Sequence, residues 1–153
     1  MIEQEISHGN FPISYSHIRD AFDFLQNWEE RYHFIAELGT KIPTYPPEFR
    51  IDQYLVRECM STVFIRATRE GSGRYLFQGD CDTSTVKGVV AILFAMFDGK
   101  TAPEIERFDA DTGFEDLGLF EHLSPTRHVG VYAMVRQVKR QVNDLEKFHS
   151  TPI

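Results

Sequence analysis

The chain of 153 residues has only two cysteines, Cys59 and Cys81, and they are not spaced as a Cys-x-x-Cys pair. In a reducing compartment, two isolated cysteines are expected to stay free thiols rather than to form a disulfide. The six histidines are scattered, so we expect no bound metal. A chain of this length can bury a core without a disulfide or a structural metal.

Positive charge and long apolar runs are also scarce. The 16 Lys and Arg residues face 23 Asp and Glu residues, which gives a net charge of -7 and disfavours a nucleic-acid partner. No apolar run is long enough to span a bilayer, and the start, Met1–Glu5, lacks the basic-then-apolar layout of a signal peptide. We therefore expect a cytoplasmic protein with no membrane partner that binds another protein.

The first third of the chain shows helical periodicity. Apolar residues at helical spacing predict a helix over about 16–25. Asn27 is placed to cap a second helix, with Glu30 as its capping-box partner, and Gly39 is predicted to end that helix in a left-handed conformation.

Three strand-like stretches follow, at residues 54–56, 61–68 and 74–78. The sequence Gly-Ser-Gly at 71–73 predicts a hairpin turn between the last two. Cys59 lies in the tight connection between the first two stretches, so its thiol is expected at a loop tip.

The remaining residues predict helices. Residues 83–97 are apolar on nearly all sides, which is typical of a central buried helix. Thr101 and Glu104 form a second capping box, a short helix is expected around 112–117, and Ser124 is placed to cap the last helix. The inner side of that last helix is predicted to carry Val131, Val135, Val138, Val142 and Leu145.

The order helix, helix, three strands, then helices predicts an α+β fold with an antiparallel sheet. We expect one domain over residues 1–153, loosely ordered at 1–13 and 149–153.

The two cysteines are the first candidates for covalent chemistry. A thiol at a loop tip is reachable by a partner, and its thiolate is the nucleophile. The alternative for Cys59 is a buried structural role, because free cysteines are among the most buried residues. Cys81 lies between Asp80 and Asp82, whose charges raise a thiol pKa. A structural role at a strand-to-helix junction, with Asp82 or Thr83 capping the helix, is therefore favoured for Cys81, and a secondary redox role is the alternative.

Two basic residues are further candidates. Arg127 lies near the start of the last helix, where the helix dipole disfavours a cation. This position predicts a specific partner such as Asp80 or Asp82, and the alternative is a solvated surface charge. Lys87 lacks the Gly-rich loop of a P-loop, and no serine-hydrolase elbow is present.

Three motifs resemble those of the SufE family, occur in the family's order with similar separations, and together span roughly residues 16–147. They are Asn27–Tyr32 with Glu37–Gly39, Gly79–Asp82 with Val86–Gly88, and Leu123–Arg127 with Gly130 and Met134. The second motif usually reads Gly-Asp-Ser-Asp, then Val-Lys-Gly, in the family. The chain is thus similar to SufE proteins, including their CsdE-like branch.

This resemblance implies helices packed on one face of a three-stranded antiparallel sheet. It also implies that Cys59, at the place of the family's cysteine, accepts a persulfide sulfur from a cysteine desulfurase. The sulfur would pass to an iron–sulfur scaffold complex or another acceptor. The chain would be a sulfur-transfer accessory protein rather than a stand-alone enzyme, without a cofactor of its own, and pyridoxal phosphate would belong to the partner.

The cysteine loop departs from the family pattern. The family commonly reads Gly-Cys-Gln-Ser-x-Val-Trp, whereas residues 58–64 read Glu-Cys-Met-Ser-Thr-Val-Phe. The loss of glycine predicts an altered loop conformation or partner. The residues expected to support Cys59 or to bind the partner are Glu58, Met60, Ser61, Asp80, Asp82, Lys87 and Arg127.

Two other functions remain open. The chain could stimulate a desulfurase as a binding module without carrying sulfur. An iron–sulfur scaffold resembling NifU and IscU proteins is disfavoured, because two cysteines are too few for the usual three-cysteine site.

Overall fold

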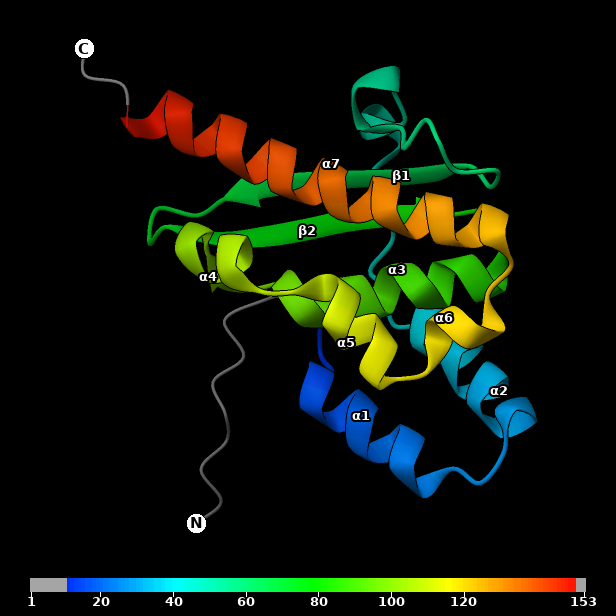
Figure 1. The fold of residues 1–153 in the computed structure, drawn as a ribbon. Coiled ribbons are helices and arrows are strands. Elements are labelled where there is room, and N and C mark those ends of the chain that lie inside the picture. The colour runs from blue at the N-terminus through cyan, green and yellow to red at the C-terminus, as the bar shows by residue number, and fades with distance from the viewer. Residues whose placement is uncertain (1–10, 151–153) are drawn as a thin grey trace.

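The structure of the protein, a computed structural model, describes residues 11–150 (Figure 1). Its elements in chain order are α1 (Tyr15–Phe24), α2 (Trp28–Gly39), η1 (Pro47–Phe49), η2 (Asp52–Tyr54), β1 (Val63–Arg69), β2 (Arg74–Cys81), α3 (Ser84–Phe97), β3 (Lys100–Thr101), α4 (Ala102–Arg107), α5 (Ala110–Asp116), α6 (Leu119–His122) and α7 (Pro125–Ser150). The fold is α+β, as predicted.

The sheet has three antiparallel strands in the order β1-β2-β3, which confirms the predicted sheet type. The hairpin predicted at 71–73 joins β1 to β2, and Glu70 N–H donates to Arg74 O at 2.8 Å across it. Gly73 has a φ of 87°, a conformation that glycine adopts without steric cost.

The third strand is not the one that the sequence predicted. Residues 52–54 form η2, and Leu55 makes only an isolated bridge with Phe64. The sheet's third strand is β3, which follows α3, so the predicted block of three consecutive strands is wrong. With two residues, β3 is too short to show the alternation by which a strand is recognised in a sequence.

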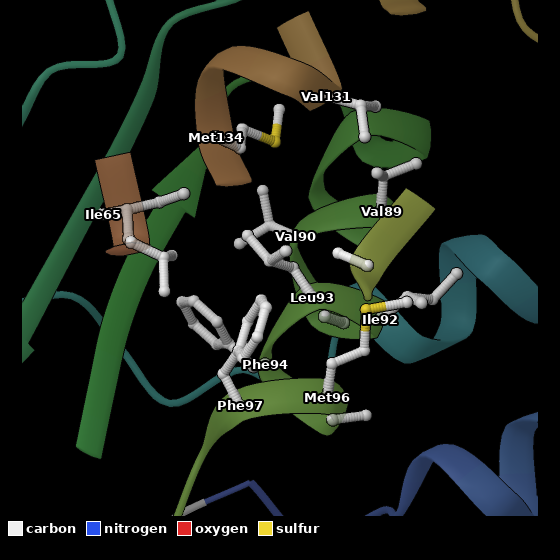
Figure 2. Packing of buried hydrophobic residues seen from close by; sticks show 14 of the residues in the cluster. Ile65, Val89, Val90, Ile92, Leu93, Phe94, Met96, Phe97, Val131 and Met134 are labelled. Atoms are coloured by element: carbon white, nitrogen blue, oxygen red, sulfur yellow. The ribbon is translucent and has the colours of Figure 1, made fainter. Parts of the chain in front are cut away.

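Helices α3 and α7 cover one face of the sheet (Figure 1). Eleven of the 14 residues of α3 are buried, which confirms it as the central helix. Figure 2 shows Ile65 of β1, Val90 of α3 and Met134 of α7 directed into the same space beside Phe94 and Phe97. Along the inner side of α7, Val131, Val138 and Val142 are buried, and Val135 and Leu145 pack against the core.

The contact between α2 and α3 depends on two glycines. A Cβ atom at Gly88 would lie 2.1 Å from the carbonyl oxygen of Ile35, and one at Gly39 would lie 3.0 Å from the backbone nitrogen of Gly88. The two helices therefore touch backbone to backbone. Gly39 stays in α2 and has no positive φ, so the predicted left-handed end is wrong, and close packing is what this glycine permits.

Three of the predicted helix caps are present, but the capping box of Asn27 and Glu30 is incomplete, because Glu30 Oε1 accepts from the Asn27 side chain and not from its backbone. The side chain of Asn27 accepts a hydrogen bond from Glu30 N–H at 2.9 Å. Thr101 and Glu104 form a complete capping box at the start of α4. At the start of α7, Ser124 Oγ accepts from the N–H of Arg127 at 3.3 Å. These local signals confirm the predicted helix starts.

The free edge of β1 is closed by side chains from α7. Ala67 N–H donates to Gln141 Oε1 at 2.8 Å, and Gln141 Nε2 donates to Ile65 O at 2.8 Å. Gln137 Nε2 donates to the same Ile65 carbonyl at 3.0 Å and to Tyr54 O at 2.9 Å. Two glutamines thereby satisfy backbone groups that an open strand edge would leave exposed.

The other face of the sheet is covered by the segment that contains η1 and η2. The Tyr45 ring stacks on Phe64 of β1 with centroids 5.7 Å apart. The guanidinium of Arg66 lies 3.7 Å from the centroid of the Phe49 ring. The long helices thus lie on one face, as expected, and an irregular segment covers part of the opposite face.

The ends of the described chain lie partly in stretches that the sequence predicted to be loose. Phe11 is buried, and its N–H donates to Asp98 Oδ2 at 3.0 Å. Helix α7 continues to Ser150, so residues 149–150 are helical. The rest of the predicted loose ends, 1–10 and 151–153, lies outside the described residues. Within residues 11–150, no helix has the length and apolarity needed to cross a bilayer.

Candidate functional site

Cys59 lies in a short loop, residues 57–62, that leads into β1. The base of the loop is closed by Val56 N–H, which donates to Val63 O at 2.9 Å, and by the bridge between Leu55 and Phe64. The prediction that Cys59 occupies a tight connection is therefore confirmed, although the preceding residues do not form a strand.

The Cys59 thiol is half-buried against the first turns of α7. A Cβ atom at Gly130 would lie 3.0 Å from the Cys59 sulfur, so any larger residue here would press on the thiol, which packs closely on this glycine. Burial raises the pKa of Cys59, a hydrogen bond from the backbone of Ser61 opposes this rise, and the charge of Asp82 adds to it. At rest, the thiol is kept protonated.

Three hydrogen bonds hold this loop to the junction between β2 and α3. Thr62 N–H donates to Asp82 Oδ1 at 3.1 Å, and Asp82 N–H donates to Thr62 O at 3.3 Å. The hydroxyls of Ser61 and Thr83 lie 3.0 Å apart and share a hydrogen bond. Ser61 and Asp82, both predicted to support Cys59, take part in these bonds between the loop and the junction.

A cavity of about 340 Å³ opens beside Cys59. Its walls combine apolar side chains with hydroxyl groups and one cation. They are formed by Cys59, Met60, Ser61, Thr83, Thr85, Val86, Val89, Leu123, Ser124, Thr126, Arg127, Val131 and Met134. The loop, α3 and the start of α7 each contribute to it, so a sulfur atom on Cys59 can be screened from water on several sides.

Sequence reasoning did not identify Thr83, Thr85 and Thr126 as parts of the site. Single threonines carry no spacing signal, and only tertiary packing brings them to one cavity. Gly130 had a signal, since it belongs to a family-like motif, but its contact with the Cys59 sulfur depends on how α7 crosses the loop.

Arg127 lines this cavity, but its predicted partner is wrong. Asp80 pairs instead with Arg50 and with Lys87, whose Nζ lies 3.3 Å from Asp80 Oδ1. Asp82 accepts from the loop. Within residues 11–150, Arg127 forms no ion pair, and its exposed side chain places a positive charge at the cavity.

Asp80 and Lys87 are not lining residues of the cavity. Burial alone would raise the pKa of Asp80, but hydrogen bonds, led by the one from Arg50, outweigh it and hold the pKa below its ordinary value. The pair is therefore a structural anchor between β2, α3 and the segment that holds Arg50.

Glu58 and Met60 flank the thiol and face solvent. The nearest cation to Glu58 is Arg136 of α7, with Glu58 Oε1 and Arg136 Nη2 3.9 Å apart. Met60 is 84% exposed, an unusual position for a large apolar side chain and one that suits contact with a protein partner.

Cys81 ends β2 and is buried, in the junction position that the sequence predicted. Burial raises its pKa to about 11, and the charges of Asp82, Cys59 and Asp80 contribute less. Thr83 is the N-cap residue of α3 but its side chain makes no capping hydrogen bond, so neither predicted cap acts as one. In the part of the chain that the structure describes, no group of three His, Cys, Asp or Glu side chains could hold a metal ion.

The chain is thus a small α+β protein whose candidate site is one half-buried thiol on a loop, beside a cavity with apolar and hydroxyl walls. Its family follows from the comparison of its sequence with known proteins. A family model described as SufE, Fe-S metabolism associated domain, matches residues 16–142. The chain belongs to the SufE family, which is associated with iron–sulfur metabolism.

One similar protein supports this family assignment, and one solved structure supports the fold. An uncharacterised SufE-like protein of Rhizobium meliloti (strain 1021) is 40% identical over 131 residues, which cover 84% of this chain and 94% of the relative. The solution structure of a hypothetical protein from Thermus thermophilus superposes with a TM-score of 0.71 at 23% identity, covering 85% of this chain and 93% of the other. This second likeness supports the fold.

Proposed function

We propose that the protein accepts a sulfur atom on Cys59 from a cysteine desulfurase and passes it to iron–sulfur cluster assembly or another acceptor. The observation that carries this proposal is the position of the Cys59 thiol, on a short loop and over a partly apolar cavity. Membership of a family associated with iron–sulfur metabolism supports it.

The transfer is a thiol–persulfide exchange. The Cys59 thiolate attacks the terminal sulfur of a persulfide on the donor's cysteine, and the sulfur–sulfur bond of the donor breaks. The electron pair of that bond stays on the donor's cysteine, which becomes a thiol after protonation. Cys59 then carries the persulfide. The donor's cysteine is reduced to a thiol by as much as Cys59 is oxidised to a persulfide, so no external oxidant is needed.

In this proposal the surrounding residues have separate roles. The raised pKa of Cys59 keeps the thiol unreactive at rest, and release of the loop from Asp82 and Thr83 exposes it to a donor. Arg127 places a positive charge at the cavity, where it favours the anionic form of the sulfur. The exposed Met60 and Glu58 are placed to contact the donor.

Within this proposal, the chain needs no cofactor of its own, because pyridoxal phosphate belongs to the desulfurase. A cytoplasmic location fits the proposal, since a reducing compartment keeps both thiols free. The second candidate is a module that stimulates a desulfurase without carrying sulfur. It is favoured by the half-burial of Cys59, which limits the thiol's reactivity.

The test is mass spectrometry of the intact protein after incubation with a desulfurase and cysteine. We expect one added sulfur atom, mapped to Cys59, and none on Cys59→Ser, which changes a single atom and should keep the thermal unfolding midpoint. Cys81→Ser is the matched control and should still load Cys59. Sulfur loading of folded Cys59→Ser would contradict the assignment. A folded Cys59→Ser that loads nothing but stimulates the desulfurase fully would favour the second candidate.

A further inference from the structure

The two cysteines lie in two turns whose pairing the proposed function does not explain. In each turn a hydroxyl residue stands two positions after the cysteine: Ser61 after Cys59, and Thr83 after Cys81.

The two turns are bonded directly to each other. The hydroxyls of Ser61 and Thr83 share a hydrogen bond of 3.0 Å, and Thr62 and Asp82 exchange two more. Cys81 is also the cross-strand partner of Val63, four residues after Cys59. The two thiols therefore lie at the same end of the sheet, within one hydrogen-bonded cluster.

Both thiols also lie on the helix-covered side of the sheet. Cys81 is buried with the inward-facing residues of β2, and the Cys59 sulfur packs on Gly130 of α7. Burial raises the pKa of Cys81, and the nearby Asp82 and Cys59 add to this rise.

We propose that Cys81 is the resolving thiol of Cys59, closing a Cys59–Cys81 disulfide that ends sulfur acceptance when the sulfur on Cys59 is not handed on. Formation of a disulfide requires the two Cα atoms to come within about 7 Å. The loop that carries Cys59 supplies the movement, because it is held mainly by hydrogen bonds, whereas Cys81 is fixed in β2.

Two routes lead to this disulfide, and the first rests on the proposed function. In the first, Cys81 attacks the Cys59 sulfur of the persulfide, the bond to the outer sulfur breaks, and that sulfur leaves with the electron pair and a proton as hydrogen sulfide. The outer sulfur is reduced and the Cys81 sulfur is oxidised by the same amount, while the oxidation state of the Cys59 sulfur does not change. In the second, hydrogen peroxide oxidises the Cys59 thiol to a sulfenic acid and releases water. Cys81 then displaces a second water molecule.

Burial makes this closure slow compared with hand-over. With a pKa of about 11, only roughly one Cys81 thiol in 10,000 is ionised near pH 7. A sulfur atom on Cys59 therefore persists while an acceptor is present, and closure competes only when hand-over fails. Reduction by a cellular thiol reopens the pair.

The peroxide arm of the experiment uses the unaltered full-length chain without any desulfurase. Reduced protein is treated with hydrogen peroxide, free thiols are blocked with iodoacetamide, and the non-reduced digest is examined by mass spectrometry. We expect a peptide pair joined through Cys59 and Cys81, which a thiol reductant separates. Recovery of Cys59 as sulfinic acid with Cys81 fully alkylated would overturn the proposal.

The persulfide arm loads the protein with a desulfurase and cysteine, removes the donor, and measures sulfide release. Unaltered protein should release sulfide as the joined peptide forms, whereas Cys81→Ser should retain its persulfide at least several-fold longer. Equal lifetimes in the two proteins, without the joined peptide, would overturn the resolving role. If neither protein gains sulfur, the proposed function fails, and the peroxide arm still decides whether the two thiols form a redox pair.

Discussion

The α2–α3 contact and the Cys59 loop, residues 57–62, are held in opposite ways. At the helix contact, an added Cβ on Gly88 would lie 2.1 Å from the Ile35 carbonyl oxygen, so the two backbones are in direct contact and an added side chain would force them apart. The loop is attached to Asp82 and Thr83 by three hydrogen bonds, each worth about 0.5–1.5 kcal/mol net. Displacing the helices therefore disrupts core packing, whereas the loop can be released for a few kcal/mol.

This difference has a functional consequence. Local opening at a cost below that of global unfolding lets a segment move while the rest of the domain stays folded. A thiol on such a segment is screened while the hydrogen bonds are made and is exposed when they break. The same thiol placed on α3 could be exposed only by unfolding the core.

The largest effect is expected from a substitution at the tightly packed α2–α3 contact. Gly88→Ala forces a Cβ into the Ile35 backbone, and the two helices must separate. We expect a loss of at least ~3 kcal/mol in the free energy of unfolding, a large share of the stability of a typical domain. Urea denaturation followed by circular dichroism measures it.

Gly71→Ala is the matched control, because nothing lies within 4 Å of an added Cβ at this exposed turn residue. We expect its free energy of unfolding to stay within about 0.5 kcal/mol of the unaltered protein. Similar free energies of unfolding for both variants would show that the α2–α3 contact can accommodate a methyl group, which would contradict the prediction.

A smaller effect is expected at the base of the loop. The buried Gln137 donates to the carbonyls of Tyr54 and Ile65, and Gln137→Ala leaves the Tyr54 carbonyl without this donor. We expect a loss of about 2 kcal/mol from the unpaired polar group and the space left behind. Arg140→Ala, exposed on the same helix, should cost less than about 0.5 kcal/mol by the same urea measurement. Equal losses would refute the role of Gln137.

The loop itself is tested at Asp82, through the rate at which iodoacetamide alkylates Cys59. Asp82→Ala removes the acceptor for Thr62 N–H and the charge that raises the Cys59 pKa, whereas Asp82→Asn removes the charge but keeps an acceptor oxygen. One hydrogen bond of about 1 kcal/mol corresponds to roughly a fivefold change in loop opening. We expect alkylation to be faster in the alanine variant than in the asparagine variant by about this factor.

The pH dependence of alkylation gives a second test, of whether the Cys59 thiol is screened. Because burial raises the Cys59 pKa, the rate should keep rising beyond the pH at which an ordinary thiol levels off, in both the unaltered protein and the variants. Equal rates for Asp82→Ala and Asp82→Asn would mean that the Thr62 hydrogen bond does not restrain the loop. A plateau below the ordinary thiol pKa would contradict the screening of Cys59.

The sequence predicted the elements whose signals are local. The Asn27 cap, the Gly-Ser-Gly hairpin and the apolar α3 depend on neighbouring residues, and all were found. The third strand was misplaced, because β3 owes its existence to pairing with β2 rather than to its own two residues. The burial of Phe11 was missed for the same reason, since its partner Asp98 is 87 residues away.

The site was predicted in part. Cys59 and its loop followed from turn position and family resemblance, but the cavity requires that α3, α7 and the loop meet. The predicted partner of Arg127 was wrong, because both candidate carboxylates bind other groups. Asp80 pairs with Arg50 and Lys87, and Asp82 accepts a hydrogen bond from the Cys59 loop. Charge pairing depends on side-chain direction, which a sequence does not encode locally.

The smallest effect is expected at Glu58, the clearest departure of the loop from the family pattern. Its pairing with Arg136, at 3.9 Å and with both side chains more than half exposed, is worth about 0–1 kcal/mol. Glu58→Gly should therefore leave the unfolding free energy nearly unchanged, and sulfur transfer to Cys59 should stay similar or rise modestly. The removed charge would lower the thiol pKa only slightly, because a unit charge about 6 Å away in water contributes roughly 0.7 kcal/mol.

Transfer rate and desulfurase affinity should be measured for both forms at low and high salt, with Arg136→Gln as the variant that removes the same pair from the other side. If Glu58→Gly loses affinity strongly at low salt only, while Arg136→Gln does not, Glu58 contacts a basic group on the donor and the loop has adapted to a dedicated partner.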